Sequence, residues 1–299
     1  MIVADKLLVE PFYDSSTGTL SYLLMDCVSL ACVLIDSVLD YDPAAGRIST
    51  VNADRMIARV NALGAQVCWI LETHVHADHL SAAAYLKQRV GGQIAIGRRI
   101  TDVQQVFGKL FNEGPDFACD GGEFDRLLDD GAELAFGDLC VQALHTPGHT
   151  PACLSYVLRI EGQTLAFVGD TLFMPDYGTA RCDFPGADAR TLYRSISRLL
   201  ALPADTLLFM CHDYCPQGRE MRYLSTVAEQ RAGNLHIHAG VDEDAFVELR
   251  TRRDASLAMP RLMLPAVQVN MRNGQLPAPQ DNGIRYLKIP HWSARAVCP

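Results

Sequence analysis

A dense group of polar residues between positions 71 and 79 constrains the fold of this chain more than any other feature. Three histidines and an aspartate fall within six positions there, namely His74, His76, Asp78 and His79. An apolar run of strand length precedes the group at 67–71, and a helical pattern of apolar residues follows it at 80–90. Asp78 can cap that helix and still serve as a ligand. Because ordinary packing does not require such a cluster, the turn predicts a metal site.

Length and composition limit the class of protein. With 299 residues and 49% hydrophobic content, the chain can bury a sizeable core in one domain, residues 1–299. The formal charge of −9, without any basic run, argues against a nucleic-acid surface. The N-terminus lacks the pattern of a signal peptide, and no segment has the length of a membrane span. We therefore expect a soluble cytoplasmic protein without nucleic-acid or membrane partners, whose ten scattered cysteines are mostly free thiols.

Strand-like apolar runs and one-sided helical patterns alternate along the rest of the chain. Strands are expected at residues 7–9, 20–25, 30–35, 93–96, 132–136, 139–144, 153–159, 164–168 and 207–210. Helices are expected at residues 52–63, 80–90, 100–110, 188–200, 217–231 and 242–253. The segment 260–290, rich in Pro, Gly and Asn, is expected to be extended, within a C-terminal extension that begins near residue 232 and packs on the domain. This order predicts an α/β fold with two sheets face to face and helices outside, a four-layer αββα sandwich.

Three more candidate ligands each follow an apolar strand, as the first cluster does. They are His149, Asp170 and His212. Each of them alone is more typical of a structural histidine or a turn. If their strands share one direction, however, all the side chains meet at one edge, where sheet-based sites are built. His145 lies inside a strand end and is expected to have a structural role.

The seven side chains can be divided between two metal positions. His74, His76 and His149 suit the first, Asp78, His79 and His212 the second, and Asp170 can bridge both. Ligands of this nitrogen and oxygen type are typical of zinc, iron or manganese and not of an ion selected by thiolates.

The arrangement resembles the metallo-β-lactamase superfamily. Its HxHxDH signature is matched by residues 74–79, its later ligands by His149, Asp170 and His212, and the match extends from about residue 11 to 231. The resemblance implies the αββα sandwich already expected from the element order. Members are mostly hydrolases, including glyoxalase II-like thioesterases, so the fold alone does not select a substrate.

Further motifs resemble the persulfide dioxygenases of the ethylmalonic encephalopathy protein type. They occupy residues 19–23, 33–38, 73–79, 146–151, 167–170, 181–184 and 212–214. A glyoxalase II typically reads CGRxFE near Arg181, and the extra Asp183 before Phe184 favours the dioxygenase branch. Where that branch has Cys-Gly before the arginine, this chain has Thr179 and Ala180, which puts the local substrate contacts in doubt. The tail resembles bacterial β-lactamase-like hydrolase proteins grouped with this branch.

The resemblance implies one non-haem Fe(2+) per chain, held by His74, His149 and Asp170. Such a triad leaves positions open for O2 and for the sulfur of glutathione persulfide or a related thiol persulfide, which would be oxidised to sulfite and thiol. The remaining candidates would form a second site or support the ligands; they are His76, Asp78, His79 and His212. The alternative is a hydrolase with two Zn(2+) ions per chain that activate a bridging water. A non-catalytic metal site fits less well, because structural sites usually close with four ligands.

Arg181 and Tyr214 are the candidate substrate-binding residues. A guanidinium offers paired donors to an anion, and the Tyr214 hydroxyl can donate near the open face. A structural ion pair between Arg181 and Asp183 is the competing interpretation. Arg219 and Arg222 are expected on one helix, where a solvated face is the simpler explanation. The sequence leaves open a sulfur-relay role for Cys182, the metal in the cell and the oligomeric state, a homodimer included.

Overall fold

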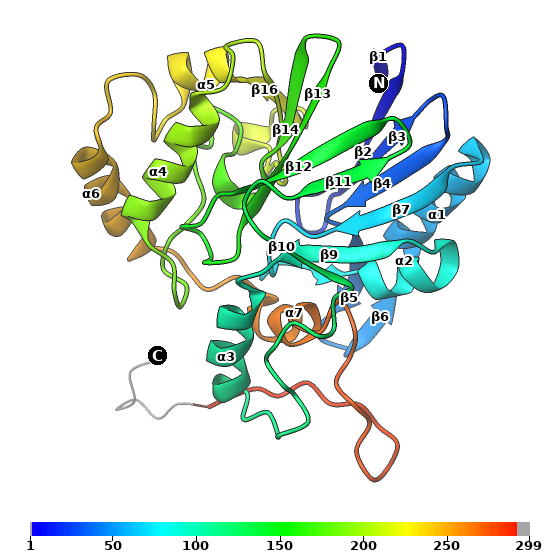
Figure 1. Cartoon of the computed structure of the whole chain (residues 1–299). Coiled ribbons are helices and arrows are strands. Elements are labelled where there is room, and N and C mark those ends of the chain that lie inside the picture. The colour runs from blue at the N-terminus through cyan, green and yellow to red at the C-terminus, as the bar shows by residue number, and fades with distance from the viewer. Residues whose placement is uncertain (1, 292–299) are drawn as a thin grey trace.

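Two β-sheets lie face to face in the computed structural model, which describes residues 2–291 (Figure 1). The first sheet has the strand order β1 (Ile2–Ala4), β2 (Leu7–Asp14), β3 (Thr19–Asp26), β4 (Ala31–Ile35), β7 (Gln66–Leu71), β9 (Gln93–Gly97) and β10 (Arg126–Leu128). The second has the order β11 (Glu133–Phe136), β12 (Leu139–His145), β13 (Leu154–Ile160), β14 (Gln163–Phe167), β15 (Leu207–Phe209) and β16 (Leu224–Thr226). A small third sheet joins β6 (Arg47–Ser49), β5 (Val38–Asp42) and β8 (Leu80–Ser81).

Helices cover the outer faces of both sheets (Figure 1). The first sheet is covered by α1 (Val51–Leu63), α2 (Ala83–Val90), α3 (Ile100–Leu110) and α7 (Met263–Asn270). The second is covered by α4 (Ala189–Leu200), α5 (Val227–Gly233) and α6 (Glu243–Asp254). The predicted four-layer αββα fold is therefore confirmed.

Strand β3 shows why the sequence requires this layering. Its residues are buried along the whole strand, and alternate side chains enter different cores. Leu20, Tyr22 and Leu24 pack between the sheets, whereas Leu23 and Met25 pack under the helices. Since successive side chains of a strand point to opposite faces, a continuous apolar run needs a layer on each side.

The strand directions bring the polar turns together. β12 and β14 are both antiparallel to β13, and β15 runs parallel to β14, so β12, β14 and β15 share one direction. In the first sheet, β4 and β7 are parallel neighbours. The carboxyl ends of β7, β12, β14 and β15 carry the predicted ligand turns, and these turns meet at one end of the sandwich. The predicted common direction is thus confirmed.

Two predicted helices differ from the structure. Residues 217–231 are not one helix, because a 3-10 turn at Pro216–Gly218 and strand β16 precede α5. Helix α5 begins only after Thr226, whose hydroxyl caps it. This boundary was readable from the Thr226-x-x-Glu229 capping box. Helix α2 likewise starts at Ala83 and not at residue 80, because residues 80–81 pair with β5.

The tail is more regular than expected. The prediction of an extended segment is wrong for Met263–Asn270, which forms helix α7 with Met263, Val267 and Val269 in the core. The predicted packing is also wrong for Tyr286 and Ile289, which are 43% and 67% exposed. All nine cysteines within residues 2–291 are free thiols. In that same part of the chain, every helix is too short or too polar to cross a bilayer.

Candidate metal centre

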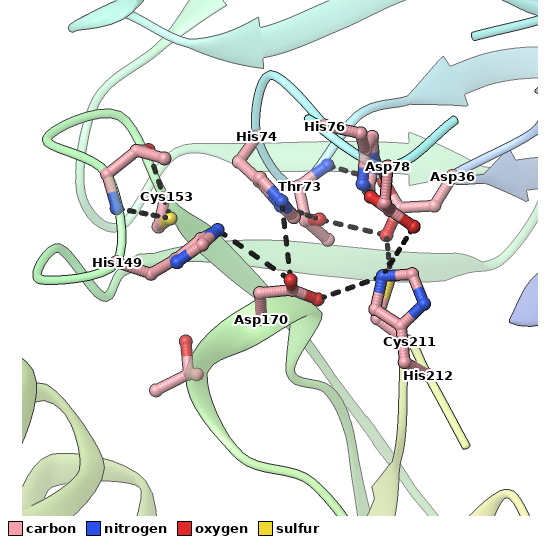
Figure 2. A network of polar contacts seen from close by, with 12 residues as sticks. Asp36, Thr73, His74, His76, Asp78, His149, Cys153, Asp170, Cys211 and His212 are labelled. Atoms are coloured by element: carbon pink, nitrogen blue, oxygen red, sulfur yellow. Dashed lines mark hydrogen bonds and ion pairs between the residues drawn. The ribbon is translucent and has the colours of Figure 1, made fainter. Parts of the chain in front are cut away.

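The structure brings the seven predicted ligand side chains together at one end of the sandwich, and Figure 2 labels all of them except His79. Candidate ligand atoms of His74, His149 and Asp170 all lie within 4.8 Å of one another. A second group with the same property follows along the site, made of His76, Asp78 and His79. His212 joins the two groups, because its Nε2 atom lies 3.2 Å from Asp170 Oδ1 and 3.4 Å from Asp78 Oδ2.

Each histidine of the first group has its ring orientation fixed by the neighbouring backbone or side chain. His149 Nδ1 donates to the carbonyl of Arg181 at 2.8 Å. The Thr73 hydroxyl donates to Asp36, so it accepts from His74 Nδ1 at 3.0 Å. Both rings therefore carry their proton on Nδ1 and direct a lone pair on Nε2 towards Asp170.

Distances within this group suit a shared ion. The Nε2 atoms of His74 and His149 lie 3.8 and 3.7 Å from Asp170 Oδ2, too far for direct hydrogen bonds. Two ligands that are each about 2.1 Å from one metal lie roughly 3–3.4 Å apart, so only a small contraction is needed.

Unpaired buried nitrogens give an independent test of the fit. Among residues 2–291, His74 Nε2, His76 Nδ1 and His79 Nε2 are buried and lack a hydrogen-bond partner. Leaving such atoms unpaired is costly in free energy unless something else binds them. His74 belongs to the ligand group that contains Asp170, and His76 and His79 belong to the group that contains Asp78, so the residues present fit a metal ion.

Charge interactions among the ligand side chains favour the same conclusion. Burial disfavours the charged form of His212, but the carboxylates of Asp78 and Asp170 outweigh it and raise its pKa to about 9. Burial and the neighbouring His76 hold the pKa of His74 well below its usual value. Burial would raise the pKa of Asp170, yet His212 and His74 lower it. A divalent cation can replace the proton on His212 and neutralise the same carboxylates.

Two acidic residues behind the ligands were missed. The Asp36 carboxylate accepts bonds from the Thr73 amide at 2.7 Å and from the Thr73 hydroxyl at 2.9 Å, and it lies 3.0 Å from His76 Nε2. Glu72 accepts from the Ser81 hydroxyl and lies 3.5 Å from the same nitrogen. Asp36 directly follows β4 and Glu72 directly follows β7, and Asp170 likewise comes shortly after the end of β14. That position was the available sequence signal.

The turn before His149 depends on a glycine. Gly148 has a φ of 136°, and an added Cβ would lie 2.4 Å from the backbone of Leu192 in α4. No other residue type fits such a close approach in that conformation. The sequence Pro147-Gly148 therefore sets how His149 enters the site.

A cavity of about 340 Å³ opens above the first ligand group. His149 and Asp170 contribute to its floor, and Phe173 and Tyr177 to its wall. The predicted substrate residues Arg181 and Tyr214 both line it. The Tyr214 ring stacks on His212 at 5.5 Å, which places it directly beside the ligands.

Arg181 is also a structural ion pair, as the competing interpretation expected. Its Nε and Nη2 atoms each donate to Asp183 at 2.5 Å, and Nη1 donates to the Ala258 carbonyl at 2.8 Å. Most of its donors are therefore already occupied. The same side chain also borders the cavity.

Two further arginines of the cavity wall were not predicted from the sequence. Arg253, in the last turn of α6, and Arg261, just before α7, line the cavity and are exposed. Their guanidinium groups have no hydrogen-bond or ion-pair partner among residues 2–291. No local pattern marks them, because only the packing of the C-terminal segment brings them to the site.

The other candidates lie outside the centre. Arg219 binds Asp176 and Asp213, and it shares no helix with Arg222. His145 contacts the Pro151 carbonyl through Nε2. Burial raises the pKa of the Cys182 thiol, which keeps it in the weakly nucleophilic neutral form.

Comparison with known proteins agrees with this geometry. Residues 19–212 match the family described as the metallo-beta-lactamase superfamily. The chain is 66% identical to a probable metallo-hydrolase of Burkholderia pseudomallei, over 94% of this chain and 98% of that protein. It is 30% identical to the mitochondrial persulfide dioxygenase ETHE1 of Homo sapiens, over 90% of this chain and 89% of that protein.

The solved structures include a similar fold. The crystal structure of ETHE1 from Myxococcus xanthus matches with a TM-score of 0.70 and 28% identity, over 90% of this chain and 100% of that one. The αββα layers, the HxHxDH turn and these similarities lead to the same conclusion. The chain belongs to the metallo-β-lactamase superfamily.

Proposed function

We propose that this protein is an iron-dependent persulfide dioxygenase. Its substrate would be glutathione persulfide or a similar anionic thiol persulfide, and one Fe(2+) per chain would be held by His74, His149 and Asp170. The observation that carries the proposal is the geometry of this triad, two histidines and one carboxylate, of which His149 and Asp170 line a cavity large enough for a small molecule. The similarity to the human persulfide dioxygenase supports it.

The reaction would convert the persulfide, one O2 and one water into the thiol, sulfite and two protons. When bound, iron supplies electrons to O2 and a coordination position for the substrate sulfur. The chain itself contributes the fixed Nδ1–H tautomers of His74 and His149, which keep Nε2 available. Tyr214 stacks on His212 at the edge of the cavity, where its ring can limit access of water to the ligands.

The charge distribution supports an anionic substrate. The whole chain carries a formal charge of −9, yet the cavity wall presents the unpaired guanidinium groups of Arg253 and Arg261. Arginine binds carboxylates through paired donors, and a cationic wall in an acidic protein concentrates anions at that place. Glutathione carries two carboxylates distant from its sulfur, so it suits a metal at the floor and arginines at the wall.

A dinuclear zinc hydrolase is the second candidate. It is favoured by His79 and His212, whose Nδ1 and Nε2 atoms each lie 3.4 Å from Asp78 Oδ2, and by the buried, unpartnered Nε2 of His79; together these residues offer a second metal position. The name of the Burkholderia relative also points to hydrolysis. In that case two metals would lower the pKa of a shared water and produce hydroxide at neutral pH.

Two measurements on one preparation separate these functions. Metal analysis of protein purified without added metal should give close to one iron per chain, and an oxygen electrode should record uptake that depends on glutathione persulfide. Two zinc ions per chain, with thioester hydrolysis and without oxygen uptake, would reject the dioxygenase in favour of the hydrolase.

A further inference from the structure

The last residue of α7 reaches the ligand turn from the C-terminal segment. Asn270 Nδ2 donates to the carbonyl of His76 at 2.9 Å and to the carbonyl of His79 at 2.8 Å. Its Oδ1 accepts from the Ser81 amide at 2.7 Å. The side chain is buried, and both of its donors as well as its acceptor are used on one short stretch of backbone.

That stretch has no regular structure of its own. Residues 72–79 lie outside helix and strand, and β8 begins only at Leu80. Four of the seven candidate ligands are carried there, two of them on the residues whose carbonyls Asn270 binds. The positions of the His76 and His79 rings therefore depend on how this backbone is held.

We propose that Asn270 is a positioning residue of the metal centre. It fixes the carbonyls of His76 and His79 relative to each other, so that both rings meet Asp78 at one point. The anchor is rigid because α7 is docked through Met263, Val267 and Val269 in the core beneath the first sheet (Figure 1). The C-terminal segment thus belongs to the metal centre as well as to the cavity wall.

Asn273 provides a matched control in the same segment. Asn270 and Asn273 are both 4% exposed, and Asn273 Nδ2 donates to the carbonyl of Glu123 at 2.8 Å. That bond leads away from the ligand turn. Asn273→Ala should therefore lower thermal stability without changing the metal centre.

The test compares Asn270→Ala, Asn270→Asp and Asn273→Ala in the full chain. Asn270→Asp keeps the shape and the acceptor for Ser81 but removes both donors. Zn²⁺ affinity is measured by competition with a chromophoric chelator, and ligand geometry by the visible spectrum of the Co²⁺-loaded protein. We expect both Asn270 variants to bind Zn²⁺ about 10- to 100-fold more weakly and to show an altered Co²⁺ spectrum, whereas Asn273→Ala matches the wild type.

Wild-type Zn²⁺ affinity and an unchanged Co²⁺ spectrum in a folded Asn270 variant would overturn the proposal, whatever its melting temperature. Failure of both Asn270 variants to fold without metal, while Asn273→Ala folds, would also overturn it, because Asn270 would then serve folding itself. These readouts are independent of the reaction, so a negative result here leaves the dioxygenase proposal standing, and the reverse also holds.

Discussion

The floor and the wall of the cavity are built in different ways. At the floor, His149 lines the cavity and His74 lies in the same ligand group; both are buried, and each has its Nδ1 fixed by a neighbour. At the wall, Arg253 and Arg261 are exposed and have no partner within residues 2–291. The histidine rings of the floor are held by hydrogen bonds, whereas the wall arginines keep their donors free. We infer from this difference that the floor determines which reaction takes place and the wall determines which substrate binds.

The largest expected effect comes from removing a ligand of the floor. Asp170→Ala eliminates the carboxylate that faces His74, His149 and His212, so three histidines lose their common anion. We expect metal content to fall below about a tenth of the wild-type value and kcat/KM to fall more than about a thousandfold. Elemental analysis and steady-state kinetics measure both. Asp176→Ala, which removes an exposed carboxylate paired with Arg219, is the control and should keep its metal. If the Asp170→Ala protein kept its metal and its activity, the floor residues would not be the ones that hold the catalytic metal.

The buried His236 lies near the arginines of the cavity wall, and their charges should make the stability of the fold depend on pH. Its Nδ1 accepts from the Thr179 amide at 3.0 Å, and burial, with the charges of Arg250 and Arg253, lowers its pKa to about 4. In the unfolded chain its pKa is about 6.5, so the unfolded state binds more protons between these values. Its contribution is complete above pH 6.5 and is lost as the pH falls to 4.

The loss should reach at most about 3 kcal/mol of unfolding free energy at pH 4. Urea unfolding of the metal-free protein between pH 7 and 4 measures it, with His236→Gln as a non-titrating comparison that keeps an acceptor. A pH dependence as steep in the variant as in the wild type would assign the loss to other groups.

Asp36 tests how far the rigidity of the floor depends on residues behind the ligands. Asp36→Asn places a donor against the Thr73 amide or against His76, both of which now face a carboxylate. We expect Zn²⁺ affinity to fall about 10- to 100-fold, because such outer partners orient the ligands. Chelator competition measures it, and Asp54→Asn, at an exposed carboxylate on α1, provides the control. Unchanged affinity would mean that the ligand turn holds its shape without Asp36.

The same comparison explains what could be predicted from the sequence. The floor was predictable because each ligand lies in a turn shortly after an apolar strand, and strand direction then brings the turns together. Asp36 and Glu72 carried that same signal, although it was not recognised. Asn270 contacts a carbonyl 191 positions away, and nothing in the sequence around it indicates that target. Arg181 and Tyr214 of the cavity lining were predicted, but the unpaired Arg253 was not, since it reaches the cavity only through the packing of α6.

The smallest expected effect concerns the wall itself. Arg253→Ala and Arg261→Ala should each raise KM for glutathione persulfide about tenfold and leave kcat within about twofold, because they remove a contact equally strong in the ground and transition states. A substrate with esterified carboxylates sharpens the test. It already lacks the anionic partner of the arginine, so the two variants should bind it almost as well as the wild type does.

Arg181→Ala should differ from both, because it also frees Asp183 and the Ala258 carbonyl and disturbs the segment that carries the His149 acceptor. It should therefore lower kcat as well as raise KM. If Arg253→Ala and Arg261→Ala lower kcat while KM is unchanged, the separation of a chemical floor from a selective wall is wrong, and the arginines act on the reacting groups.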